Sequence, residues 1–297
     1  MSYRVFHYQI KRIKRGLLIW LTLITLLLNL WLDNLKFSIF QTNSNTKNKI
    51  QEKRAKWFTN QLIKLGSAFI KIGQLLSARP DLIPNTWIKE LSTLQDQVPN
   101  FSFSVVEETI KKELGPKFSE INQILFEPIG SASLAQVHRA TLKDNREVVF
   151  KVQRPNLKDL FIIDLGIMQQ IASLLQKNKN WSRGRNWVEI AKECRKVLMK
   201  ELDFNCEAQY AARFRQQFLD DENILIPEVI WDMSTEKVLC LTYLKGTKIS
   251  NVKDLKAQNY NLTKIAEVGA ISYLKQLINY GFFHADPHPG NLAISAE

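Results

Sequence analysis

The chain has 297 residues, 45% of them hydrophobic, and can therefore bury the core of one large domain or two small ones. Its formal net charge of +12 suggests a nucleic-acid binder at first. Residues 1–64, however, hold 12 Lys and Arg against 2 Asp and Glu, which leaves 29 basic and 27 acidic residues for the rest. A basic arm beside an apolar run suits an anionic membrane surface better than a nucleic-acid groove, so no nucleic-acid partner is expected.

The three cysteines, Cys194, Cys206 and Cys240, are an odd number and contain no short Cys-x-x-Cys pair. This spacing indicates neither a disulfide framework nor a zinc site. We expect small side chains on helices and a strand, in a reducing compartment.

The first 40 residues combine a basic cluster at 11–15 with an apolar run at 17–32. Sixteen helical residues cover about 24 Å, short of the roughly 30 Å hydrocarbon core unless residues up to Phe40 extend the segment. A span with its basic end in the cytoplasm would place the rest of the chain outside. A signal peptide would need a small-residue cleavage site, and none follows. Residues 1–40 are therefore expected to bind the membrane surface or lipids at the cytoplasmic face, as an interfacial or re-entrant anchor.

The next elements are expected to be helical. Residues 41–56 open with a polar stretch and are predicted to be a linker. Apolar positions recur every three or four residues over 57–76, which predicts one amphipathic helix. Shorter helices are predicted at 86–94 and 105–114, so that residues 57–118 form a helical extension.

The pattern then changes to that of a sheet. Runs rich in β-branched or apolar residues predict strands at 124–129, 134–142 and 147–153, with a hairpin turn at 143–146. The remaining predicted elements are helices at 162–175 and from 187 to about 218, strands at 225–231 and 237–243, a helix at 262–280 and a loop at 282–291.

Residues 130–137 read GSASLAQV between two predicted strands. A protein kinase covers the nucleotide phosphates there with G-x-G-x-x-G-x-V, whose glycines let backbone N–H groups approach the oxygens. Only the first Gly and the Val match, because Ala132 and Ala135 replace the other glycines, and small-residue turns between strands are common. Lys151 follows Val137 by 14 residues, on the strand where a kinase places the Lys that neutralises the α- and β-phosphates.

The strongest pattern is HADPHPGN at 284–291. Kinases carry H-x-D, four further residues and then Asn, where the Asp accepts the proton of the attacking hydroxyl and the Asn holds Mg²⁺. Asp286 and Asn291 match these two positions. A metal site made of His284 and His288 would need both rings on one helical face, which the intervening prolines prevent. A purely structural loop is the remaining alternative.

Five motifs in this order resemble the UbiB (AarF-type) family of atypical protein-kinase-like proteins: KIGQ with LSARPDL, SASLAQVH, VVFKVQRP, KELDFNCEA and GFFHADPHPGN. The resemblance covers about residues 55–291. It implies an α+β, protein-kinase-like two-lobe fold with an N-terminal helical extension. The small lobe, with inserted helices, would comprise 119–243, and the beginning of the large lobe 244–297.

The resemblance also implies a function. ATP or ADP and Mg²⁺ would be the cofactors of an ATPase or phosphotransferase that supports isoprenoid-quinone or membrane-lipid metabolism. Proteins of those pathways would be its partners.

Several residues take roles from the family. Lys71 and Gln74 match the family's own Lys and Gln, on a helix that in relatives packs over the nucleotide site and blocks peptide substrates. Glu201 and Asp203 match its E-x-D pair, and Glu201 is expected to bind Lys151. From periodicity alone, all four would be solvated residues on helices.

The nucleotide loop and the catalytic loop take roles in the same way. Gly130, Ser131, Ala132 and Ser133 match the alanine-bearing loop that replaces the glycine-rich one, and its added Cβ atoms are expected to alter nucleotide preference. His284, Asp286 and Asn291 match the catalytic loop, with Asp286 as its Asp and Asn291 as its Mg²⁺ ligand.

The sequence departs from the family at Glu297, where it stops before the strand and D-F-G segment that follow a catalytic loop. Two expectations follow: the chain is a fragment of a longer protein, or its phosphotransfer is impaired, since the D-F-G Asp binds a bridging Mg²⁺. The second leads to an alternative function as a catalytically impaired remnant or membrane scaffold.

Overall fold

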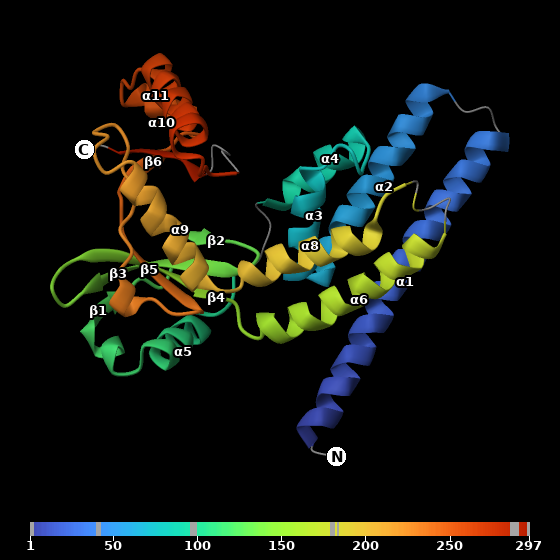
Figure 1. Cartoon of the computed structure of the whole chain (residues 1–297), viewed down its shortest axis with the longest axis horizontal. Helices are drawn as coiled ribbons and strands as arrows, with labels where there is room; N and C mark the ends of the chain where they lie inside the picture. Colours follow the sequence, from blue (N-terminus) through green and yellow to red (C-terminus); the bar gives the residue numbers. More distant parts are fainter. Residues whose placement is uncertain are drawn as a thin grey trace. The chain divides into compact units, whose positions relative to one another are not determined.

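The computed structural model describes residues 3–39, 43–95, 100–178, 182, 184–285 and 291–295. The chain forms two compact units, each assembled from three stretches. The first unit comprises 1–106, 129–136 and 153–202, and the second comprises 107–128, 137–152 and 203–297. Both helices and sheet are present (Figure 1), which confirms the predicted α+β class.

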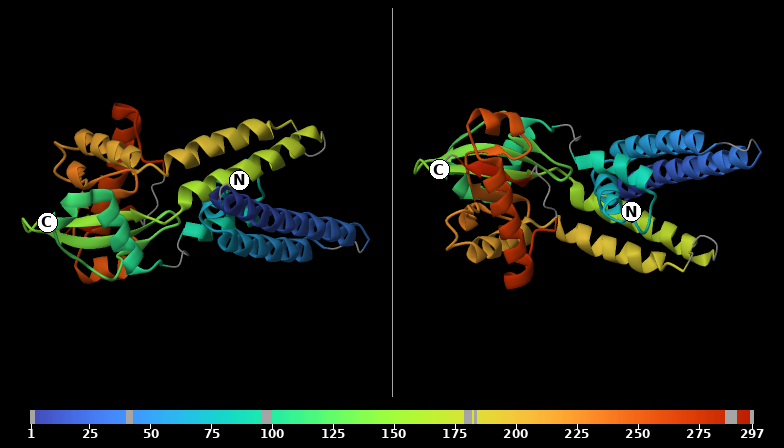
Figure 2. Two further views of the ribbon diagram at one scale, coloured as in Figure 1. Left: turned by 90° about the horizontal axis from the view of Figure 1, so that it is seen from below. Right: turned by 90° about the horizontal axis from the view of Figure 1, so that it is seen from above.

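The first unit begins with a helical hairpin. Helix α1 covers Tyr3–Ile39 and α2 covers Ser44–Leu65, and the two lie side by side in both views of Figure 2. Residues 44–56 are therefore helical where a linker was predicted. Asn43 caps α2, since its side chain accepts a hydrogen bond from the backbone N–H of Thr46. The buried face of α2, which the polar composition hides, consists of Ala55, Thr59, Leu62 and Leu65.

Gly66 separates α2 from α3, which covers Ser67–Ser77, where a single helix had been predicted. Its φ of 90° lies in the left-handed region that favours glycine, and this interrupts the helix. Helix α4 (Asn85–Leu91) and the 3₁₀ helix η1 (Ser92–Gln95) pack against α3. Gly73 makes this contact close, because a Cβ there would overlap Leu94 and lie 2.9 Å from Leu62 Cδ1, so that these leucine side chains would have to shift.

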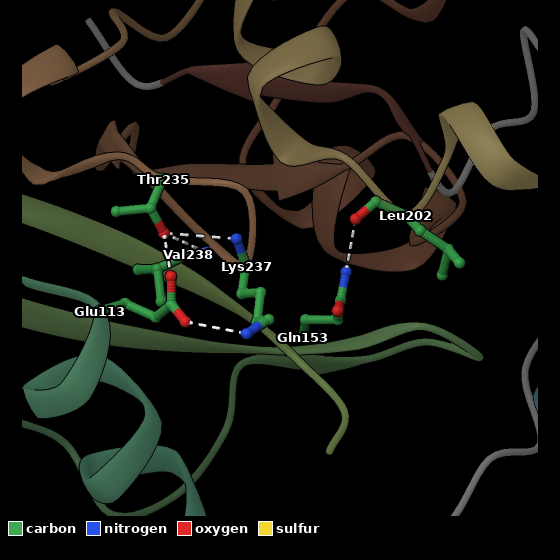
Figure 3. A network of polar contacts seen from close by, with 6 residues as sticks. All are labelled: Glu113, Gln153, Leu202, Thr235, Lys237 and Val238. Atoms are coloured by element: carbon green, nitrogen blue, oxygen red, sulfur yellow. Dashed lines mark hydrogen bonds and ion pairs between the residues drawn. The ribbon is translucent and has the colours of Figure 1, made fainter. Parts of the chain in front are cut away.

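Two longer helices complete the first unit. Helices α6 (Leu157–Lys177) and α8 (Trp187–Lys200) pack against each other, and α6 also contacts α1 and α3. The predicted helix from 187 to about 218 is two helices, because α8 ends at Glu201 and Asp203 caps the next one. The Nε2 of Gln153 donates a hydrogen bond to the carbonyl oxygen of Leu202 at 2.7 Å and fixes the chain just after α8 (Figure 3).

The main sheet has strand order β1-β3-β4-β5, and β2 also pairs with β3. The pairs β1–β3 and β4–β5 are antiparallel, and the turn predicted at 143–146 connects β3 to β4. In place of the strand predicted at 225–231, the structure has a single bridge between Val229 and Leu241. The strand bounds are β1 Ile121–Ile124, β2 Gly130–Ser131, β3 Ala135–Leu142, β4 Glu147–Gln153 and β5 Val238–Thr242.

Helices α5 (Phe103–Leu114) and α9 (Phe204–Gln217) lie on opposite sides of the sheet (Figure 1). Glu113, at the end of α5, accepts hydrogen bonds from the Thr235 hydroxyl at 3.0 Å and from Lys237 Nζ at 3.1 Å (Figure 3). These bonds attach α5 to the turn that precedes β5. Short 3₁₀ helices lie at Gly115–Glu120 (η2) and Trp231–Met233 (η3).

The last part of the second unit is mainly helical. Helix α10 covers Val252–Ala257, and α11 covers Leu262–Lys275 and continues as a π-helix, η4, over Gln276–Tyr280. Strand β6 (Gly246–Lys248) pairs with β7 (Ala293–Ser295). Lys275 contacts Asp221 at 2.7 Å and ties α11 to the loop that follows α9.

Candidate functional site

Lys151 lies on β4 and forms an ion pair with Glu207 in the first turn of α9. Its Nζ is 2.6 and 2.7 Å from the two carboxylate oxygens and 5.1 Å from the centre of the Phe204 ring. The alternation along β4 buries Val148, Phe150 and Val152 completely and places Lys151 on the other side of the strand. The Lys151 side chain is 27% exposed, so the carboxylate that holds its ammonium group does not cover the side chain completely.

Glu201 does not bind Lys151, and this prediction was wrong. Glu201 follows the last turn of α8 and pairs with Lys71 on α3, with 2.8 Å between Lys71 Nζ and Glu201 Oε2. The chain breaks its helix between Glu201 and Phe204, and the helix that then begins presents Glu207 to the strand lysine. Sequence reasoning missed Glu207, although an acidic residue in the first turn after the Asp203 cap was a signal for it.

The predicted residues on α3 are both partly buried. Lys71 is tied to Glu201, and the Nε2 of Gln74 donates to the carbonyl oxygen of Leu94 at 3.2 Å. With the close packing at Gly73, these contacts hold α3 against α8 on one side and η1 on the other. Lys71 and Gln74 therefore position a helix within the first unit. Periodicity alone had indicated solvated surface residues, which they are not.

The loop at Gly130–Ser133 is closed by its own backbone and by an arginine. The N–H of Ala132 donates to the Ala135 carbonyl at 2.8 Å. Arg154 contacts the Ala132 carbonyl and the Ser131 hydroxyl, each at 3.1 Å. Ser133 is almost fully buried. This loop is thus held in one shape, and its contact with phosphates stays a prediction.

Asp203 has a structural role. Its carboxylate accepts a hydrogen bond from the N–H of Asn205 at 2.9 Å and caps α9. It thereby fixes the start of the helix that carries Glu207. This capping role accounts for Asp203 without a contact to a metal or a nucleotide.

The catalytic-loop residues lie only partly within the described chain. His284 is exposed, and its backbone N–H donates to Gln276 Oε1 at 3.0 Å, which connects this segment to η4. Asn291 is exposed, next to β7. Asp286 lies outside the described residues, so its convergence with Lys151 stays a prediction.

The predicted Mg²⁺ site would have to be built from oxygen ligands. The exposed Asn291 side chain carries an amide oxygen, which is a hard ligand of the kind Mg²⁺ prefers. Among the described ranges, no group of three or more His, Cys, Asp or Glu side chains is arranged to hold a metal. A Mg²⁺ ion would therefore depend on phosphate oxygens and the Asp286 loop as well as on Asn291.

The cysteines match their predicted surroundings. All three are free: Cys194 and Cys206 lie on α8 and α9, and Cys240 lies buried on β5. Burial raises the pKa of the Cys240 thiol to about 12. A thiol with this pKa is not a nucleophile at neutral pH.

A strand lysine held by a glutamate of the helix that packs on its sheet is an arrangement found in protein-kinase-like domains. The chain belongs to the ABC1 atypical kinase-like family, whose domain model matches residues 93–297. The UbiB resemblance is thereby confirmed, since one of the relatives carries that name.

Two relatives show how similar this chain is to named proteins. The protein ACTIVITY OF BC1 COMPLEX KINASE 8, chloroplastic, of Arabidopsis thaliana is 42% identical over 95% of this chain and 38% of its own length. The probable protein kinase UbiB of Cellvibrio japonicus is 37% identical over 78% of this chain and 42% of its own. The chain thus spans less than half the length of either relative.

The solved structure of the Rv3197–erythromycin complex from Mycobacterium tuberculosis matches with a TM-score of 0.58 and 25% identity. The match covers 86% of this chain and 64% of that one. It supports the kinase-like fold predicted from the motifs.

Proposed function

We propose that this chain binds ATP or ADP together with Mg²⁺ and belongs to an ATPase or phosphotransferase. The observation that carries the proposal is the ion pair between Lys151 and Glu207. In protein kinases the corresponding lysine neutralises the α- and β-phosphates only when a helix glutamate holds it in place.

The surroundings of Lys151 suit an anionic ligand. Both oxygens of Glu207 face the ammonium group, and the Phe204 ring packs against it, so the group cannot rotate freely. An ammonium group has three donors, and two of them are directed at Glu207. The third can meet a phosphate oxygen without breaking the pair.

The remaining roles follow from the family membership. Asp286 would accept the proton of the attacking hydroxyl, and Asn291 would hold Mg²⁺. Bound Mg²⁺ would neutralise negative charge on the phosphates while the phosphoryl group is transferred. Lys71 and Gln74 would limit access to the nucleotide, as the resemblance to the family implies.

The cellular role is proposed as support of isoprenoid-quinone or membrane-lipid metabolism at a membrane. The names of the Arabidopsis and Cellvibrio relatives support kinase-type activity. The apolar helix α1 supports association with a membrane. Proteins of such a pathway are the expected partners.

Nucleotide binding can be tested by titrating a fluorescent ATP analogue with and without Mg²⁺. Lys151→Met should weaken binding at least about tenfold, since it removes a charge-assisted contact worth roughly 1.5–3 kcal/mol. Lys237→Met is the matched control, because Lys237 also pairs with a glutamate, Glu113, in the same unit. Equal affinity of the wild type and Lys151→Met would refute the site and favour a membrane scaffold.

A further inference from the structure

Helix α1 has two opposite faces. Ile19, Leu26 and Asp33 recur at intervals of seven residues and are buried, with 3%, 9% and 5% of their surface exposed. Ile19 joins the core that α2, α3 and α6 share. One stripe of α1 is therefore a packing surface of the first unit.

The other face of α1 is apolar and exposed. It recurs every three or four residues, as expected of a single helical stripe. Its members, each more than two-fifths exposed, are Ile13, Leu17, Leu21, Ile24, Leu28, Trp31, Leu35 and Ile39. A stripe of this length is too large to be scattered surface hydrophobics and indicates a partner.

Two ion pairs attach α1 to the rest of the first unit, one on each side of its apolar run. Arg15 binds both carboxylate oxygens of Asp164 on α6 at 2.7 Å and also donates to the Leu65 carbonyl at the end of α2. Asp33 binds Arg54 on α2, with oxygens 2.6 and 3.0 Å from the guanidinium nitrogens. Arg15 and Asp33 are 18 positions apart, which corresponds to about 27 Å of helix. The packed face is thus fixed along nearly the whole apolar segment.

The attachment of α1 to α2 and α6 argues against a position in which α1 spans the membrane. By length and composition alone, Arg12–Ile39 is long and apolar enough to cross a bilayer. To do so it would have to separate from α2 and α6 and break both ion pairs, or take α2 with it. Helix α2 carries exposed Lys49, Lys53 and Lys56, and each charge is expensive in hydrocarbon.

We propose that α1 lies in the plane of an anionic membrane surface, with the exposed stripe among the acyl chains and its opposite face still attached to α2 and α6. The charge distribution specifies this partner. Residues 1–64 carry a net charge of +10, which attracts anionic headgroups and repels the same region of a second copy. The inference deepens the proposed membrane association and is independent of nucleotide binding.

Flotation of the full chain with preformed vesicles tests the stripe. Binding should be stronger to phosphatidylcholine vesicles that contain phosphatidylglycerol than to phosphatidylcholine alone. Leu21→Gln/Leu28→Gln should weaken binding at least about tenfold, because two side chains leave the acyl region. Leu219→Gln/Leu225→Gln is the matched control, since these leucines are similarly exposed but lie in the second unit. Equal loss in both double variants would overturn the proposal.

Labelling from outside sealed vesicles tests the orientation. Gln9→Cys and Ser38→Cys each introduce one thiol at an exposed position near an end of α1, in a background with Cys194→Ser, Cys206→Ser and Cys240→Ala. The two positions are about 43 Å of helix apart, as long as a bilayer with its headgroups is thick. A membrane-impermeant maleimide should label both. Labelling of only one end would establish a span and overturn the in-plane position.

A second copy on the stripe is the other outcome that the experiment can reveal. In that case the wild type would be a dimer in the absence of vesicles, Leu21→Gln/Leu28→Gln would dissociate the dimer, and the wild type would not float with vesicles. This result too would overturn the proposal. ATP-analogue binding is measured on the same samples. Intact nucleotide binding with failed flotation would refute the membrane position alone and leave the proposed function standing.

Discussion

Lys71 on α3 and Glu201 at the end of α8 form an ion pair, with 2.8 Å between Nζ and Oε2. Glu201, which was expected to bind Lys151, therefore binds Lys71, and Glu207, six residues later, is the glutamate that pairs with Lys151. The two lysine–glutamate pairs therefore have different places in the fold: one holds a helix of the first unit, and the other holds Lys151, for which we propose contact with phosphate.

Substitution of the two glutamates separates these roles. Glu207→Gln should lower ATP-analogue affinity about as much as Lys151→Met, because the lysine loses the carboxylate that holds it. Glu201→Gln should leave affinity within about twofold, since its partner is Lys71. Titration of the three variants with one fluorescent nucleotide checks this. A larger loss in Glu201→Gln than in Glu207→Gln would restore the original assignment.

Gly73 should be intolerant of even one added methyl group. Gly73→Ala would force Leu94 and Leu62 apart, and overpacking of this kind costs about 1–3 kcal/mol. The gain in helix propensity offsets up to about 1 kcal/mol of that cost. Urea unfolding measures the difference. Gly166→Ala on α6 is the control, because nothing lies within 4 Å of its added Cβ, and it should be neutral or stabilising.

The Arg15–Asp164 pair makes stability depend on pH in a defined direction. Asp164 is fully buried, and burial raises its pKa above the ordinary value although Arg15 opposes the shift. When the pKa of a carboxyl group is raised in the folded state, the free energy of unfolding falls as the pH rises from its unfolded-state pKa to its folded-state pKa. Arg15→Met removes the opposing cation and strengthens this effect.

We expect Arg15→Met to cost about 3 kcal/mol or more at pH 7 and clearly less at pH 4, where Asp164 can take up a proton. Urea unfolding at both pH values provides the measurement. Arg15→Met/Asp164→Leu should recover most of the loss, because no buried charge remains unpaired. A single variant that is equally destabilised at both pH values would show that packing, and not charge, is the cause.

The Cys240 thiol should resist labelling in the folded protein. Its pKa of about 12 leaves almost no thiolate at pH 8, and the residue is buried on β5. Cys206 is partly exposed and should react with a maleimide under the same conditions. Mass spectrometry of peptides labelled before and after unfolding in urea distinguishes the two. Rapid native labelling of Cys240 would mean that β5 opens locally.

The local patterns determined much of this protein. Hydrophobic periodicity predicted helical structure over 57–76, although Gly66 divides it into two helices, because burial of one face leaves its period in the sequence. A turn between two apolar runs predicted the hairpin of β3 and β4. The ordered motifs predicted the family and the kinase-like class. Lys151 was identified because it lies 14 residues after Val137, on the predicted strand where a kinase places its phosphate-binding lysine.

Only the tertiary structure decided which partner that is. Glu201 and Glu207 are both acidic residues near a helix boundary, and the break at Asp203 determines which one faces β4. The same limit applies to residues 44–56, whose polar composition concealed a helix, and to α1, whose buried stripe depends on Asp164 and Arg54. Periodicity records that a face is covered, but a long-range ion pair leaves no period in the sequence and is fixed only when the chain folds.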